Sequence, residues 1–288
     1  MKRLLILSGK GGTGKTTTAA AFVKLARARA FADCDVDAPN LHLVTQMPGQ
    51  PEKSDFIGAQ KAVIDPQKCV SCGLCREHCR FDAIFMESGK AAVQEYACEG
   101  CGVCQYLCPQ DAVRMEEDVA GEQFLYKGDR VFSTAKLKMG RGNSGKLVTA
   151  VKVALFKNAP HTELAIIDGS PGIGCPVIAS VSGVDLVLVV AEPSLSGISD
   201  LERLLKTAEA FDTRLAVCVN KWDVSPQNTE KIRKFCWAQK IPFVGEIPYD
   251  PEASKAINQG RTLADADCPA GKALEEIFSQ VLKLIDLK

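Results

Sequence analysis

The sequence contains no apolar run long enough to cross a membrane, which takes about twenty residues, and no excess of charge of one sign. We therefore expect no stable membrane insertion. Thirty-five basic residues balance thirty-five acidic ones, so no global field favours a polyanion and no nucleic-acid partner is expected. With 288 residues, 46% of them hydrophobic, and no low-complexity tract, the composition predicts a globular chain of one large or two smaller domains.

The N-terminus also lacks the long apolar region of a secretory signal. Basic residues at positions 2 and 3 precede Leu4–Leu7, but this run then breaks into glycine and lysine. We therefore expect a cytoplasmic protein. In a reducing compartment, the thirteen cysteines indicate metal ligands rather than disulfides.

The segment from Gly9 to Thr16 has the spacing of a P-loop, G-x-x-x-x-G-K-[ST]. A buried strand is expected before it at Leu4–Leu7, and a helix after it over Thr18–Ala30. The backbone N–H groups of such a loop converge on phosphate oxygens, the lysine reaches the β and γ phosphates, and the threonine binds magnesium. The predicted cofactor-binding residues are Gly9, Lys10, Gly11, Gly12, Thr13, Gly14, Lys15, Thr16 and Thr17.

The second lysine, Lys10, completes the pattern K-G-G-x-G-K-T. This pattern resembles the deviant-Walker ATPases, the group of MinD, ParA, Mrp and the nitrogenase iron protein. The resemblance implies that Lys10 reaches the nucleotide of a partner subunit, and hence an ATP-dependent homodimer. A second cation there would neutralise charge that develops on the β–γ bridge.

Two later segments resemble the switches of the same family. In the first, the D-x-D of residues 33–35, the resemblance assigns to Asp35 the positioning or activation of the attacking water. In the second, Asp168 closes an apolar run and is placed to hold Mg²⁺ together with Thr16, while Gly172 offers its N–H to the γ-phosphate. The predicted catalytic residues are Lys10, Lys15 and Asp35.

The identity of the base is less well defined. Asn220-Lys221-Trp222-Asp223 matches the N-K-x-D pattern that reads guanine, because an Asp carboxylate accepts from both guanine N–H groups. The family resemblance instead implies that Asn220 faces adenine and that a loop containing Pro248 closes over the base. ATP is the favoured nucleotide, and GTP remains the alternative.

Eight cysteines form an internal repeat with a period of 29 residues. The pattern C-x-x-C-x-x-C-x-x-x-C occurs twice, with the spacing of bacterial two-cluster ferredoxins, in which the fourth cysteine serves the other cluster. Zinc also binds C-x-x-C pairs, but it does not explain the doubled pattern. We predict two 4Fe-4S clusters, one held by Cys69, Cys72, Cys75 and Cys108 and the other by Cys98, Cys101, Cys104 and Cys79.

Apolar runs at Leu164–Ile167, Leu186–Val190 and Leu215–Val219 alternate with helical segments. This alternation predicts an α/β fold, a doubly wound parallel-sheet P-loop NTPase with an inserted small α+β ferredoxin domain. The expected domains are a discontinuous ATPase domain at 1–62 and 119–288 and the insert at 63–118. The segment 136–146 is expected to be a flexible return linker.

Two features of the remaining chain are less specific. Cys175 lies at the offset where the nitrogenase iron protein carries a cluster cysteine, but no second cysteine completes such a site, and a structural thiol is favoured. The C-terminal segment has apolar residues at helical spacing and few flanking basic residues, which predicts a helix that packs on the core.

These features lead to a functional hypothesis. We expect an ATP-dependent, dimerising iron–sulfur protein whose nucleotide state gates electron transfer through two 4Fe-4S clusters to an unidentified redox or cofactor-bearing partner. One alternative is an assembly or carrier ATPase for clusters or metallocofactors, although no C-x-x-C follows Cys108. Another is a ParA/MinD-like positioning ATPase, which the balanced charge disfavours as a binder of DNA or membrane.

Overall fold

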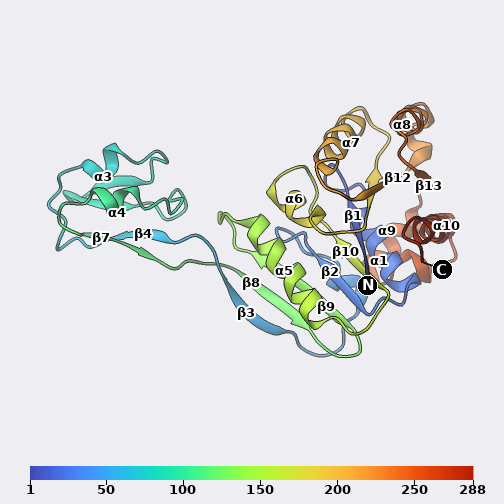
Figure 1. Cartoon of the computed structure of the whole chain (residues 1–288), viewed down its shortest axis with the longest axis horizontal. Helices are drawn as coiled ribbons and strands as arrows, with labels where there is room; N and C mark the ends of the chain where they lie inside the picture. The colour runs from blue at the N-terminus through green and yellow to red at the C-terminus, as the bar shows by residue number, and fades with distance from the viewer. Residues whose placement is uncertain (288) are drawn as a thin grey trace. The chain divides into compact units, whose positions relative to one another are not determined.

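The computed structural model describes residues 1–287 and contains two compact units. Unit 2 comprises Ser54–Glu122 and Leu137–Asn143, and unit 1 comprises the rest. Both the N-terminus and the last described helix belong to unit 1 (Figure 1). The division lies outside the predicted range of 63–118 at both ends, because two strands, β3 (Glu52–Ile57) and β8 (Val119–Tyr126), run across the boundaries. The identity of the insert as a ferredoxin domain stays a prediction.

Unit 1 is built on one sheet with the strand order β13-β12-β11-β1-β10-β2-β9-β8-β3. All neighbouring strands from β13 to β9 pair in parallel. This confirms the predicted α/β parallel-sheet P-loop NTPase fold. The bounds of these parallel strands are β1 (Lys2–Leu7), β2 (Ala30–Asp33), β9 (Val131–Leu137), β10 (Leu164–Asp168), β11 (Leu186–Ala191), β12 (Arg214–Asn220) and β13 (Phe243–Ile247).

Helices cover both faces of the sheet, so its central strands are apolar on both sides, as parallel strands must be. One face carries α1 (Lys15–Leu25), α2 (His42–Thr45), α9 (Pro251–Asn258), η2 (Leu263–Asp265) and α10 (Pro269–Leu284). The other carries α5 (Ser144–Asn158), α6 (Cys175–Val181), α7 (Leu195–Ala208) and α8 (Pro226–Ala238), with η1 (Trp222–Val224) before α8. Phe22 of α1 packs on Phe278 of α10, with ring centroids 4.9 Å apart. The terminal helix packs on the core, as predicted.

The first helix is shorter than the sequence suggested. It was expected over Thr18–Ala30, but α1 ends at Leu25 and β2 already begins at Ala30. The reason is a tight turn in which Arg27 takes a left-handed conformation with φ of 44°. The turn reverses the chain so that Phe31 enters the sheet fully buried.

Unit 2 contains the sequence repeat as a structural repeat. Its first half consists of β4 (Lys61–Ile64), α3 (Leu74–Glu77) and β5 (Ile84–Glu87), and its second half of β6 (Lys90–Val93), α4 (Val103–Leu107) and β7 (Val113–Glu116). Strand β4 pairs with β7 and β5 with β6, so each half completes the other. Two lysines at equivalent positions of the repeat each contact the other half. Lys61 donates to the carbonyl of Cys98, and Lys90 donates to the carbonyl of Cys69.

The segment 136–146 is not the flexible linker that the sequence suggested. Its middle part packs into unit 2 through Arg141, whose side chain is 9% exposed. The guanidinium pairs with Glu95 and with Asp118 at 3.1 Å and lies 5.1 Å from the ring centre of Tyr96. Arg141 therefore helps to anchor the returning chain, together with the N–H of Lys138, which donates to the carbonyl of Ala120 at 2.8 Å.

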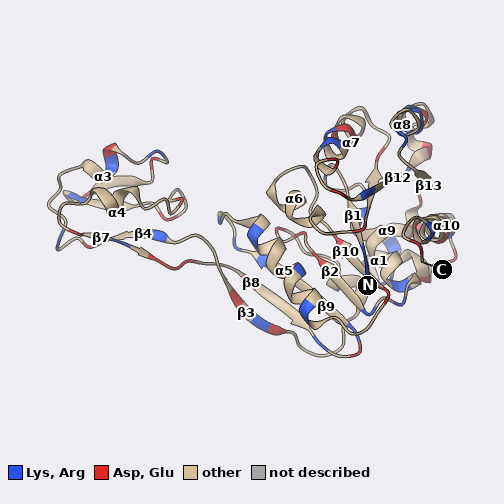
Figure 2. Cartoon of the chain, in the orientation of Figure 1, with Lys and Arg blue, Asp and Glu red and all other residues tan. Residues whose placement is uncertain are grey.

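Charged residues are mixed by sign over the chain, as on helix α7 in Figure 2. In residues 1–287 no helix combines the length and the apolar character that a membrane span requires.

A buried lysine joins two helices beside the sheet. Lys152 of α5 is 6% exposed, and its ammonium donates to the carbonyls of Ala179, Ser180 and Ser182 at 2.9, 2.7 and 2.6 Å. These carbonyls end α6, whose last turn lacks helical partners, so the ammonium caps it. Burial lowers the pKa of Lys152 to about 8.

Replacement of this lysine predicts a specific pH dependence of stability. Between pH 8 and 10.5 the unfolded chain keeps the proton on Lys152 while the folded chain has lost it. The unfolding free energy of the wild type, relative to Lys152→Met, should therefore rise by about 2–4 kcal/mol as the pH increases through this interval. Urea melts of both proteins across the interval measure the difference. A difference that stays constant would contradict the buried-ammonium assignment.

Candidate nucleotide-binding site

The P-loop connects β1 to α1 and depends on glycine at defined positions. Gly12 and Gly14 have φ of 79° and 94°, which favour glycine. A Cβ on Gly9 would lie 2.4 Å from Cβ of Asp200, and one on Gly14 would lie 2.3 Å from Nδ2 of Asn220. A Cβ on Gly11 or Gly12 would meet no atom within 4 Å. The loop is thus packed at both ends and open in the middle, where phosphates approach a P-loop.

Lys15, the predicted P-loop lysine, lies between carboxylates at the ends of parallel strands. Its ammonium is 2.6 Å from Oδ1 of Asp168 and 3.8 Å from Oδ2 of Asp35, and it donates to Oγ1 of Thr16 at 3.2 Å. Burial alone would lower the pKa of Lys15, but Asp168 and the neighbouring carboxylates raise it. The structure therefore brings together the residues predicted for phosphate, magnesium and water.

Asp168 and Thr16 also present oxygen atoms that suit a magnesium ion. Asp168 is fully buried, and its Oδ2 atom has no hydrogen-bond partner among the described residues. An unpartnered buried carboxylate oxygen is costly unless a cation or donor completes it. The donor set, one carboxylate and one hydroxyl, is of the hard type that Mg²⁺ prefers.

The first switch is organised by Asp33, the first aspartate of the D-x-D motif, for which the sequence left open a role as a polar group of the switch loop or as a cap of the next turn. The Asp33 carboxylate accepts from the backbone N–H groups of Asp35, Asn40 and Leu41 at 3.0, 2.9 and 2.9 Å. Burial, followed by the proximity of Asp168, raises the pKa of Asp33 to about 7. Asp33 thus holds the loop that carries Asp35. An aspartate at the carboxyl end of a buried strand, followed by a turn, was the available signal.

The second switch, which contains Gly172, contacts the loop after β1 in this structure. The N–H of Gly172, expected at the γ-phosphate, instead donates to the carbonyl of Ser8 at 3.0 Å. Because Gly172 has φ of 95°, its peptide is turned toward β1 in this structure. Its contact with the γ-phosphate stays a prediction, and it requires this N–H to leave the carbonyl of Ser8.

A pocket of about 190 Å³ lies beside the P-loop, where the sequence placed the base. Asn220 and Pro248 line it, as predicted. Asn220 also donates through Nδ2 to the carbonyl of Thr13 at 2.7 Å, and Oδ1 of Asp223 accepts from the N–H of Tyr249 at 2.7 Å. Asn220 thus connects the end of β12 to the P-loop. Asp223 holds the loop that contains Pro248 through the N–H of Tyr249.

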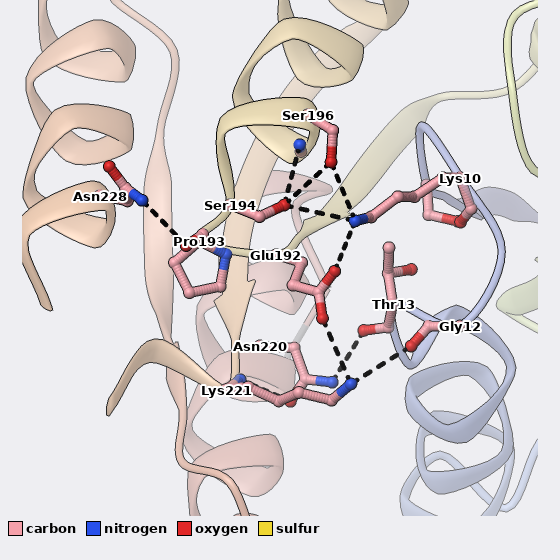
Figure 3. A network of polar contacts seen from close by, with 12 residues as sticks. Lys10, Gly12, Thr13, Glu192, Pro193, Ser194, Ser196, Asn220, Lys221 and Asn228 are labelled. Carbon is pink, nitrogen blue, oxygen red and sulfur yellow. Dashed lines mark hydrogen bonds and ion pairs between the residues drawn. The ribbon is translucent and has the colours of Figure 1, made fainter. Parts of the chain in front are cut away.

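Lys10 lies in a polar network that includes residues the sequence analysis missed (Figure 3). Its ammonium is 2.7 Å from Oε2 of Glu192 and 3.3 Å from the hydroxyls of Ser194 and Ser196. Lys221 approaches the other oxygen of Glu192 at 3.4 Å. Glu192 directly follows β11, at the sheet edge where parallel α/β proteins bind ligands, and this position is the signal that could have found it.

Four of the eight repeat cysteines line one cavity in unit 2, and their role as cluster ligands stays a prediction. A small cavity is lined by Cys79, Cys98, Cys101 and Cys104, the four residues assigned to one cluster. Backbone N–H groups of Ala62, Ala83 and Ala112 point at the sulfurs of Cys98, Cys79 and Cys108 at 3.5, 3.4 and 3.3 Å. None of the thirteen cysteines, all of which lie within residues 1–287, forms a disulfide. Cys175 is exposed at the start of α6, which does not fit a buried structural thiol.

Comparison with known proteins identifies the family. The model of the CobQ/CobB/MinD/ParA nucleotide binding domain matches residues 4–263. The chain belongs to this family. An uncharacterised protein of Methanocaldococcus jannaschii is 32% identical over 98% of this chain and 97% of its own length.

Solved structures of the family share the fold. The MinC:MinD complex of Aquifex aeolicus matches with a TM-score of 0.56 and 18% identity over 98% of this chain and 96% of that one. The septum site-determining protein MinD of Pyrococcus horikoshii, complexed with Mg-ADP, matches with the same TM-score, identity and coverage. The expected MinD/ParA relationship is confirmed.

The functional hypothesis from the sequence is corrected by these findings. The family match points to a MinD/ParA-type nucleotide-binding protein. Within residues 1–287, no three or more His, Cys, Asp or Glu side chains are grouped so that they could hold a metal ion. Nucleotide-gated electron transfer to a redox partner is therefore withdrawn as the function of this family member.

The geometry of the first switch gives a testable prediction. Asp33→Ala removes the acceptor of three buried or partly buried N–H groups. Unfolding free energy should fall by about 2–4 kcal/mol, because the buried N–H of Leu41 left without a partner costs roughly 1–3 kcal/mol and the part-buried N–H groups of Asp35 and Asn40 cost less. Hydrogen exchange at Asp35, Asn40 and Leu41 should quicken.

The matched control for this change is Asp37→Ala, which removes an exposed carboxylate from the same loop. It should leave both stability and exchange nearly unchanged. Equal effects of the two substitutions would show that Asp33 does not organise the loop.

Proposed function

We propose that this protein is an ATPase of the MinD/ParA type, which dimerises with ATP, hydrolyses it and thereby positions or recruits a protein partner. The observation that carries the proposal is the site around Lys15, where Asp168, Asp35 and Thr16 converge on one ammonium group. The match of residues 4–263 to the CobQ/CobB/MinD/ParA nucleotide binding domain supports an ATPase of this type. A relative of the same fold was solved as a MinC:MinD complex, which supports a protein as partner.

Each residue of the site would have a separate role in binding and hydrolysing ATP. The open middle of the P-loop would receive the phosphates, and Lys15 would move from Asp168 to the β and γ phosphate oxygens. Thr16 and Asp168 would hold Mg²⁺, which neutralises charge on the phosphates when bound. Asp35, whose side chain is 18% exposed and whose Oδ2 lies 3.8 Å from Nζ of Lys15, would orient the attacking water. Lys10 of the partner subunit would stabilise the leaving group.

ATP is favoured over GTP by the base pocket. Guanine readout uses a free Asp carboxylate that accepts from two base N–H groups. In this chain Oδ1 of Asp223 accepts from the backbone of Tyr249, and Asp223 is not among the residues that line the pocket. Asn220 and the loop of Pro248 remain as the lining of the pocket, which suits adenine as the family resemblance implies.

The lysine at position 10 provides the test of this function. In Lys10→Ala the P-loop lysine Lys15 is intact, so binding of ADP should stay within about twofold, while ATP hydrolysis should fall by roughly 100-fold or more. Isothermal titration with ADP and steady-state phosphate release measure the two quantities.

Lys234→Ala on α8 is the control, because it removes an exposed ammonium whose nearest carboxylate, on Glu230, is 3.9 Å away. It should hydrolyse ATP at the wild-type rate. Wild-type hydrolysis by Lys10→Ala would refute an ATPase that depends on this lysine.

We also propose that unit 2 holds two 4Fe-4S clusters on its eight repeat cysteines, as cofactors that fix its fold. Four of these thiols line one cavity, and three sulfurs of the set receive backbone N–H groups. Ligands of a single tetrahedral zinc ion lie roughly 3.8 Å apart, given Zn–S bonds near 2.3 Å. In a cluster each thiolate binds a different iron, so its ligands lie further apart than the ligands of a single metal ion.

Metal analysis tests the cluster proposal directly. Full-length protein purified without oxygen should contain about eight iron atoms per chain. Cys101→Ser should retain about half of them, whereas Cys175→Ser, which changes an exposed thiol of unit 1, should retain all. Stoichiometric zinc, or no bound metal, would overturn the proposal.

A further inference from the structure

Glu192 contacts two lysines that come from different nucleotide-binding motifs. Its Oε2 atom is 2.7 Å from Nζ of Lys10 in the P-loop, and its Oε1 atom is 3.4 Å from Nζ of Lys221 in the N-K-x-D motif. Lys221 also donates to the carbonyl of Gly12 at 3.4 Å. As Figure 3 shows, one carboxylate therefore stands between the two motifs. The ammonium of Lys10 lowers the pKa of Glu192, so the carboxylate is ionised at neutral pH.

The two residues that follow Glu192 are held in place by hydrogen bonds. The carbonyl of Pro193 accepts from Nδ2 of Asn228 at 3.3 Å, and the hydroxyl of Ser194 caps α7 by accepting from the N–H of Gly197 at 3.0 Å. The loop after β11 is thus held at both sides. Glu192 presents its charge to Lys10 from a defined position.

The contacts of Lys10 use its full capacity as a donor. A lysine ammonium has three N–H groups, and in this structure it meets three acceptors, the carboxylate of Glu192 and the hydroxyls of Ser194 and Ser196. To donate to a phosphate oxygen, Lys10 has to give up at least one of them. The carboxylate is the charged member of the three, so it is the strongest competitor.

We propose that Glu192 is a positioning residue that holds Lys10 within its own subunit, so that the phosphates of ATP compete with this carboxylate for the lysine. The inference rests on the proposed function, because Lys10 acts on a nucleotide only if the protein binds one. Glu192 then sets the ATP concentration at which Lys10 is released for the partner subunit. Glu192 also contacts Lys221, which belongs to the predicted base-binding motif and donates to the carbonyl of Gly12 in the P-loop.

Charge is the property that the proposal assigns to Glu192, so Glu192→Gln is the informative change. Glutamine has a similar shape but no charge, and it should release Lys10 more readily. The side chains of Lys10 and Glu192 are 33% and 25% exposed, and an ion pair so exposed changes an equilibrium by about two- to fivefold. The ATP concentration for half-maximal dimerisation should fall by that factor.

Two measurements are needed to separate this proposal from the proposed function. The first is the rate at which an amine-reactive ester labels Lys10 in full-length protein without added nucleotide, followed by mass spectrometry of peptides. This rate should rise by about two- to fivefold in Glu192→Gln and return toward the wild-type rate in Glu192→Asp, which restores the charge. The second is light scattering during a titration with ATP.

The matched control is Glu246→Gln. Glu246 is a part-buried carboxylate, 21% exposed, that pairs with Arg233 on α8 and has no contact with the P-loop. It should change neither the labelling of Lys10 nor the ATP dependence. A purely structural role of Glu192 would lower stability without altering either readout.

The outcomes are distinguishable. Unchanged labelling of Lys10 in Glu192→Gln overturns the proposal, whatever ATP does. Faster labelling without dimerisation in any variant supports the positioning of Lys10 by Glu192 and refutes the proposed ATP-dependent dimer. Faster labelling with an unchanged or higher half-maximal ATP concentration would overturn the claim that the carboxylate competes with ATP.

Discussion

The ion pair between Lys15 and Asp168 is the interaction on which the site depends. A buried ammonium is stable in a protein only when carboxylates and acceptors replace its water. Asp168 supplies that charge at 2.6 Å, and Asp35 adds a second carboxylate at 3.8 Å. Because β10 lies between β1 and β2 in the sheet, the P-loop and both switches must meet at this point. The parallel topology thus makes one lysine common to all three segments.

The two lysines of the P-loop have different surroundings. Lys15 is 5% exposed and is enclosed by the switch carboxylates, whereas Lys10 is partly exposed and contacts the loop after β11. A buried pair is sensitive to the loss of one partner, while a partly exposed pair exchanges partners at little cost. Lys15 therefore suits a place inside the site of its own subunit, where phosphates would replace Asp168 as its partner, and Lys10 suits a role in which it reaches the nucleotide of another subunit.

Much of the fold was predictable because short local patterns determine it. The apolar runs at β1, β10, β11 and β12 bounded by glycine or polar residues gave the parallel sheet, and the P-loop spacing located the phosphate site. The early end of α1 at Leu25 was not predictable, because it depends on a left-handed Arg27 rather than on a glycine or proline.

Contacts between distant segments were also missed. Glu192 meets Lys10 across 182 residues of sequence, and no local pattern links them. Arg141 was assigned to a flexible linker for the same reason.

The central claim is that ATP joins two copies of this chain. Multi-angle light scattering of the full-length protein measures this most directly, with saturating Mg-ATP in one sample and Mg-ADP in another. The account predicts a mass near twice that of the 31.0 kDa chain with ATP and near one chain with ADP. The same mass in both samples would contradict it.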